Sequence, residues 1–272
     1  MNRGLLIKSM REAAAATAIL CVALLLIEVI LASILPTLWN DFSSVLFQIE
    51  FFQTIIKALL GTDIGDMLGP EAIMAIAWVH PVVLAIIWTH AIVLGTRVPA
   101  GEIDRGTIDV LLGLPVSRWR VYWSETAVLA GTGVILIAMG LLGHRLGMLT
   151  TEWDQEPALG PLIAVTANFF CLYLAVGGLA FLVSAVSDRR GRAIAVIFAI
   201  LLASFLLNFL AQFWRPAEMV SFLSLLSYHK PLIVMRSGGT WPLGDMTVLF
   251  GFAVATWLAG GIWFARRDIC TV

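Results

Sequence analysis

The sequence predicts an all-α polytopic membrane protein with six transmembrane helices. Hydrophobic residues make up 60% of its 272 residues, and its mean hydropathy is +0.94. Charged residues make up only 13%, whereas a water-soluble domain has about a quarter. Six stretches are apolar over about 20 residues, the length that crosses a bilayer. Together, composition and spacing indicate one transmembrane domain over residues 1–272, with no repeat and no linker.

The six spans follow one another along the whole chain. We expect them at about 13–35, 72–96, 121–143, 158–186, 193–213 and 246–265. The basic residues before the first stretch could suggest a signal peptide. The stretch is longer than the roughly 7–15 apolar residues of such a peptide, however, so we expect a retained span preceded by a basic amphipathic helix.

The distribution of basic residues predicts the orientation. Six spans place both termini on one side, and basic residues concentrate in the cytoplasm. A cytoplasmic N-terminus puts twelve of the seventeen basic residues inside. We therefore expect a multi-pass protein of the cell membrane, in contact with lipid, whose two termini are cytoplasmic. The net charge of −1 gives no indication of a nucleic-acid partner, and the three separated cysteines imply no disulfide.

Two outer segments are longer than simple turns. Apolar residues recur at helical spacing over 39–60, which predicts an extracytoplasmic helix in the membrane interface. The segment 214–244 combines a short helical pattern with Pro and Gly, and we expect it to cap or re-enter the bundle. Asp245 is the expected N-cap of the sixth span.

One cytoplasmic stretch, 101–125, is dense in charge. Its first part predicts a short amphipathic helix over 101–114, with Ile103, Thr107, Val110, Leu111 and Leu114 on one face and Arg105 and Asp109 opposite. Pro115 ends that helix. Ser117 is then the expected N-cap of the third span, with Val116 and Val121 spaced as a hydrophobic staple.

Two interpretations of this helix remain open from the residues alone. It could be an interfacial helix that only joins two spans. Acidic residues are unfavourable beside anionic headgroups, however, and a protein partner would account better for clustered charges of both signs.

The stretch GEIDRGTIDVLLGLPVSRWRVYWSE resembles the cytoplasmic segment of exporter-type ABC transporter permeases, the ABC type 2 family. The N-terminal MNRGLLIKSMRE, the six spans and FARRDI after the last span are similar too. The resemblance implies that the 101–114 helix is a coupling helix seated in a groove of a cytoplasmic ATPase subunit. It also implies that two such subunits act with this chain and with a second permease copy or homologue. It assigns ATPase coupling to Glu102, Asp104, Arg105, Thr107, Asp109, Pro115 and Arg118.

The nucleotide chemistry would then belong to another chain. A phosphate-binding GxxxxGK[ST] loop needs Gly before its Lys, and the three lysines here follow Ile, Ile and His. We expect no catalytic residue and no cofactor in this chain, with ATP and Mg²⁺ bound by the partner ATPase. The chain is thus interpreted as a transport subunit rather than an enzyme.

Polar residues inside the spans are candidates for a substrate path. Charged groups in a membrane are costly and are often functional, although a structural hydrogen bond would equally explain Glu28. Asn168 and Asn208 have interhelical hydrogen bonding as their simplest role. The candidates are Glu28, His80, Asn168 and Asn208. No His pair has the i, i+4 spacing of metal ligands, so no metal site is expected.

Two alternative functions stay open. A membrane-embedded enzyme acting on lipid or peptide would need clustered polar residues, and only Glu28, His80 and His90 could supply them. An ATPase-coupled complex could also transduce a signal or extract a protein rather than export. The few charges in the spans favour a hydrophobic or amphipathic cargo.

Overall fold

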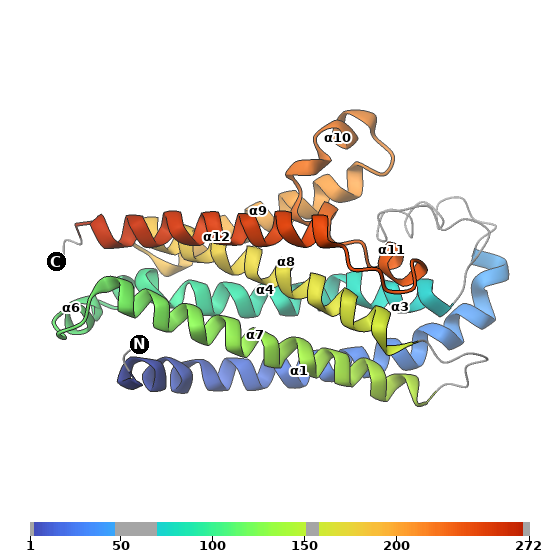
Figure 1. The fold of residues 1–272 in the computed structure, drawn as a ribbon, viewed down its shortest axis with the longest axis horizontal. Helices are drawn as coiled ribbons and strands as arrows, with labels where there is room; N and C mark the ends of the chain where they lie inside the picture. The colour runs from blue at the N-terminus through green and yellow to red at the C-terminus, as the bar shows by residue number, and fades with distance from the viewer. Residues whose placement is uncertain (1–2, 47–69, 151–157, 269–272) are drawn as a thin grey trace.

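The computed structural model describes residues 3–46, 70–150 and 158–268, and within these ranges the chain forms helices and no strands. The long helices lie side by side in an elongated bundle, and both termini lie at the same end (Figure 1). We call this end, which holds Arg3, Ile108 and Arg267, the basal end. The opposite end, which holds Pro70 and Pro231, is the distal end.

Short helices lie between α1 and α7 and between α9 and α12, while α7, α8 and α9 follow one another directly. Five of them, α1, α7, α8, α9 and α12, are long and apolar enough to cross a membrane, and α4 with the following segment makes a sixth if the bent pair is one span. This confirms the predicted all-α polytopic fold. The elements are α1 (Arg3–Leu46), α3 (Pro70–Val79), α4 (Pro81–Gly95), η1 (Arg97–Gly101), α5 (Glu102–Asp104), α6 (Ile108–Leu112), α7 (Arg118–Met148), α8 (Leu159–Val186), α9 (Arg190–Leu210), α10 (Arg215–Met219), η2 (Ser221–Leu223), η3 (Leu225–Tyr228), α11 (Pro231–Arg236) and α12 (Leu243–Arg266).

The N-terminal basic segment is not separate from the first span. Helix α1 runs from Arg3 to Leu46 with Pro36 inside it. It therefore joins the expected amphipathic helix, the first span and the first residues of the expected 39–60 helix. The rest of that interfacial helix lies outside the described residues.

The second span is broken, unlike the uninterrupted 72–96 helix that hydropathy predicts. Proline has no N–H and disfavours helix in the residue before it. His80, before Pro81, is extended at φ −60° and ψ 131°, and its Nδ1 accepts a hydrogen bond from the Val82 N–H at 3.3 Å. His80 thus caps the N-terminus of α4.

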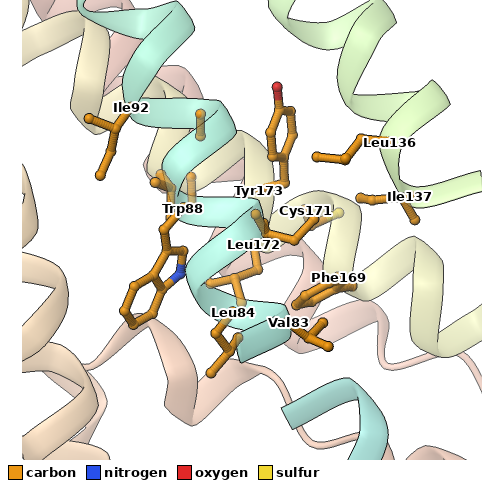
Figure 2. Close-up of a cluster of buried hydrophobic side chains, with 14 of the residues drawn as sticks. Val83, Leu84, Trp88, Ile92, Leu136, Ile137, Phe169, Cys171, Leu172 and Tyr173 are labelled. Atoms are coloured by element: carbon orange, nitrogen blue, oxygen red, sulfur yellow. The ribbon is translucent and has the colours of Figure 1, made fainter. Parts of the chain in front are cut away.

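The main core forms where α4, α7 and α8 meet (Figure 2). Phe169 and Tyr173 of α8 are fully buried there beside Leu136 of α7. The Tyr173 hydroxyl donates to the Leu129 carbonyl and lies 2.9 Å from Nδ1 of His90. The Nε2 atom of His90 lies 3.1 Å from the Thr17 hydroxyl. Helix α8 is thereby fixed to both α4 and α7. Cys21 and Cys171 are free and buried.

Helix α7 packs closely along α1 because glycines face it. A Cβ on Gly147 would lie 2.5 Å from the Val29 carbonyl oxygen, and one on Gly143 would collide with the Leu25 carbonyl. Real side chains do not approach that closely, so this seam requires glycine.

The segment between the fifth and sixth spans caps the distal end in part, as predicted. Helix α11 packs against α3 and α8, whereas α10 projects away from the bundle (Figure 1). The predicted N-cap at Asp245 is wrong. Helix α12 begins at Leu243, and Asp245 lies in its first turn. An acidic side chain there stabilises the helix through its interaction with the helix dipole.

Candidate functional site

The charged stretch forms a structured connector at the basal end, between the kinked segment η1 and α7 (Figure 1). We call residues 102–117 the basal connector. It contains two short helices, α5 and α6, and not the single 101–114 helix that we predicted. Gly106, at φ +68°, lies between them in the left-handed region that favours glycine, so the backbone turns there.

The inner face of the basal connector packs in a small hydrophobic cluster. Ile108 and Leu111 are buried there with Leu5 of α1, Val98 of η1 and Val121 of α7. The predicted apolar face is therefore partly wrong. Thr107 is exposed, as are Val110 at 75% and Leu114 at 47%, because the turn at Gly106 changes the register of the second helix.

Glu102 faces inward and joins the basal connector to α1. Its carboxylate is buried and lies 3.3 Å from Lys8 Nζ and 3.0 Å from Arg105 Nη2. The Thr107 hydroxyl donates to the same carboxylate, so the start of the connector and the first turns of α1 form one charged network.

Arg97 extends this network to α7. Its guanidinium is buried, with Nε donating to Glu125 Oε2 at 3.1 Å and Nη1 donating to the Ser9 carbonyl at 2.8 Å. Glu12 lies 3.9 Å away. Neither Arg97 nor Glu125 was among the predicted site residues. The available signal was an arginine directly after one apolar stretch and a glutamate within another.

Arg118 fastens the start of α7 to the end of α12. It donates to the carbonyls of Phe264, at 3.0 Å, and Arg267, and its guanidinium lies 5.8 Å from the Phe264 ring centroid. Arg267 in turn donates to the Ala185 carbonyl at 2.8 Å and the Ser187 carbonyl at 3.1 Å, and it pairs with Asp188. Cationic side chains are favourable at these helix C-termini.

The outer face of the basal connector is exposed and mixed in character. It presents the acidic Asp104 and Asp109, the basic Arg105 and the apolar Val110 and Leu114. Pro115 is also exposed, and the prediction that it ends the helix is wrong, because α6 already ends at Leu112 with Gly113 as its C-cap. The predicted cap is confirmed, because the Ser117 hydroxyl accepts from the Arg120 N–H at 3.3 Å. This face can bind a partner without disturbing the packed inner face.

Glu28 lies against His144 and does not face an open path. Both side chains are buried, and Glu28 Oε2 lies 2.9 Å from His144 Nδ1. This pair was not predicted because the third span was expected to end at 143, whereas α7 continues to Met148. The Trp78 ring centroid lies 5.7 Å from that of His144.

The other intramembrane candidates take part in separate contacts. Asn168 donates to the Tyr228 carbonyl at 3.1 Å, and its Oδ1 lies 2.7 Å from His229 Nδ1. Asn208 accepts from Ser227 at 3.2 Å and lines a cavity of about 20 Å³ with His229. With His80 capping α4, the four residues do not form one continuous path. Within the described ranges, no group of three or more His, Cys, Asp or Glu could hold a metal ion.

A comparison with protein families identifies the chain. The family model described as ABC-2 family transporter protein matches residues 46–241, well over half of the chain. The chain belongs to this family. A comparison with curated proteins finds no match.

The residues matched by the family model contain most of the helices of this ABC-2 transporter. The matched range begins at the last residue of α1 and includes the basal connector and α7 to α11. Family and fold together make this ABC-2 transporter a multi-pass permease with a transport role rather than an enzymatic one.

Proposed function

We propose that this ABC-2 transporter is the permease subunit of an ATP-driven exporter, with a separate ATPase dimer docked on the basal connector. The observation that supports this best is the division of the connector into two faces. Its outer face is exposed and mixes charges with apolar residues, while its inner face is packed against α1, η1 and α7. A partner that binds the outer face therefore acts on a segment fixed to three parts of the bundle.

The contacts of the connector give two routes for that action. Glu102 transmits movement to α1 through Lys8. Val116, packed in the cluster with Val121, and the Ser117 cap transmit it to α7. Lys8 is half-exposed, whereas Val116 is packed against Val121 and Ser117 caps α7. The route to α7 therefore couples movement of the connector to a helix more firmly than the route to α1.

In our proposal, the partner supplies the ATP chemistry. The ATPase dimer binds ATP and Mg²⁺ in the cytoplasm, so the basal end and both termini are cytoplasmic, and a second permease copy or homologue completes the complex. Asp104, Arg105 and Asp109 select the partner through charge complementarity. Glu102, Thr107 and Arg118 act within the chain and hold the docking face in place.

The enzyme alternative has less support. Glu28 pairs with His144, His80 caps α4, and His90 contacts Thr17 and Tyr173, so the three residues do not converge. An ATPase-coupled complex that transduces a signal or extracts a protein would use the same docking face. Only an exporter would move a cargo across the membrane of reconstituted vesicles, so this measurement distinguishes the two.

The test is co-purification of the tagged permease with an ABC ATPase from the membranes of its native cell. The variant Asp104→Arg/Asp109→Arg reverses two exposed charges on the outer face, and Glu218→Arg, exposed on distal α10, is the matched control. We expect the double variant to recover at least tenfold less ATPase, and the control to recover as much as the parent. Unchanged recovery with the double variant, at an unchanged melting temperature, would show that the connector is not the docking site.

A further inference from the structure

His229 lies at the distal end, between η3 and α11, with an oxygen atom beside each of its ring nitrogens. The side chain is buried, at 4% exposed. Its Nδ1 lies 2.7 Å from Asn168 Oδ1, and its Nε2 lies 3.4 Å from the carbonyl oxygen of Trp78. A neutral imidazole donates through only one ring nitrogen, so it cannot be the donor in both contacts.

The orientation of Asn168 determines which nitrogen carries the hydrogen. Asn168 Nδ2 donates to the Tyr228 carbonyl at 3.1 Å, and exchanging the two amide atoms would place an oxygen against that carbonyl. Oδ1 therefore faces His229, and Nδ1 of the imidazole is its donor. Burial lowers the pKa of His229 to about 4, so the imidazole is neutral at neutral pH. Its Nε2 then has a lone pair and no hydrogen.

That lone pair faces a second acceptor. The break at His80 leaves the Trp78 carbonyl without its usual helical partner, because the Val82 N–H bonds to His80 Nδ1 instead. Nε2 and the carbonyl therefore lie together, and neither supplies the other with a hydrogen. A buried acceptor without a donor is costly, so a donor from outside the chain is expected here.

A cavity beside His229 has the room and the polarity for that donor. Its volume is about 20 Å³, above the roughly 10–15 Å³ that one water molecule needs. Asn208 of α9 also lines it, and its amide has both a donor and an acceptor atom, so it can bind a water in either orientation. Two polar partners are within the usual range for a buried water. The other lining residues are apolar: Val79, Leu84, Phe205, Phe209 and Leu226.

We propose that this cavity binds one ordered water molecule, which donates to His229 Nε2 and hydrogen-bonds the Asn208 amide. The water joins α9 to α8 through the contact between His229 and Asn168. Helix α9 needs such an attachment because few of its 21 residues are buried, namely Ala193, Ile197, Leu201 and Ser204. The site does not depend on the ATPase, so it is tested on the permease alone.

The first test reads the ring nitrogens of His229 by nitrogen NMR of the full-length chain, with isotope-labelled histidine, in lipid bilayers at neutral pH. The signals lost in His229→Gln identify this residue. We expect a protonated Nδ1 and a non-protonated Nε2 that receives magnetisation from water at least fivefold more strongly than Nε2 of His90, which faces the Thr17 hydroxyl. Any other protonation pattern would overturn the proposal, since an imidazolium would donate to Trp78 directly. A non-protonated Nε2 with no more transfer than His90 would overturn it too.

The second test displaces the water. Asn208→Leu removes a polar partner and fills the cavity, whereas Gln212→Leu makes the same kind of change at a half-buried residue that does not line it. Radiolysis converts bound water into hydroxyl radicals that oxidise adjacent side chains, and mass spectrometry measures the oxidation of His229. We expect oxidation in the parent and in Gln212→Leu, and at least fivefold less in Asn208→Leu. Equal oxidation in all three would overturn the proposal.

A comparison within the parent decides the same question without any substitution. His90 is fully buried, and its ring nitrogens contact Tyr173 and Thr17. We expect His229 to be oxidised at least fivefold more than His90, although both are buried. Equal oxidation of the two histidines would show that the cavity binds no water.

Discussion

Arg97 is a buried cation whose position depends on a few oxygen atoms. The Ser9 carbonyl, the Ser9 hydroxyl and Glu125 accept its N–H groups. A buried ion pair adds little net stability, because both charges lose water, but removing one partner leaves the other charge unpaired.

Replacing Arg97 by Ala should therefore lower the free energy of unfolding by about 3–5 kcal/mol, because Glu125 would remain buried without its cation. Arg105→Ala is the matched control. The Arg105 side chain is 51% exposed, so its ion pair with Glu102 should contribute less than about 1 kcal/mol. Thermal and denaturant unfolding in detergent measures both, and equal effects would contradict this account.

Glu28 and His144 should also depend on each other as a pair, as Arg97 and Glu125 do. In a double-mutant cycle with Glu28→Ala and His144→Ala, we expect a coupling free energy of about 1–3 kcal/mol, since each single change leaves the other side chain buried without its 2.9 Å partner. Glu28→Gln should cost less, because the amide can still hydrogen-bond the imidazole. Strictly additive effects of the two alanine changes would show that the contact contributes nothing.

At the scale of the helices, the seam between α1 and α7 permits a test within a single helix. Gly143→Ala should destabilise the bundle by about 1–3 kcal/mol, because its Cβ would meet the Leu25 backbone. Gly131→Ala, in the same helix but with open space around the added Cβ, should be neutral or stabilise by up to about 1 kcal/mol. Melting temperatures in one detergent compare them. A destabilised Gly131→Ala would refute the packing explanation.

The sequence was sufficient to predict the spans but not their interruptions. Runs of about 20 apolar residues identify spans whatever packs against them. The break at Pro81 and the turn at Gly106 each depend on one residue inside a favourable pattern. Both carry a recognised local signal, a proline and a glycine. Averaging over a window, or placing residues on one continuous helical wheel, hides such signals.

The site was predictable in its location and less so in its contacts. The density of charge at 101–125 located the basal connector, and the Ser117 cap follows from local spacing. The inward orientation of Glu102 depends on Lys8, 94 positions away in the chain, and the pairing of Glu28 depends on His144. Hydropathy assigned His144 to a loop because His and Arg145 end the apolar run, although the helix continues through them.

At the scale of the whole molecule, the proposed orientation can be tested from outside the cell. Two cysteine variants are made in a Cys270→Ser background. Thr240→Cys places a thiol at an exposed position of the distal end, and Asp109→Cys places one at an exposed position of the basal end. A membrane-impermeant maleimide should label Thr240→Cys on intact cells and Asp109→Cys at least tenfold less until the cells are permeabilised, because both termini and the connector are proposed to be cytoplasmic. The reverse pattern would invert the topology.

Helix α1 has a mechanical consequence. From Arg3 to Thr37 it is a rod of about 50 Å, well beyond the roughly 30 Å of hydrocarbon. It is held near one extremity by the charged network at Lys8 and Ser9, and along its farther half by glycine contacts at Leu25 and Val29. Thr17, near the middle of α1, also lies 3.1 Å from His90 of α4, and α7 packs along α1. Movement of the basal end of α1 can therefore reach its distal end through one continuous helix rather than through a hinge.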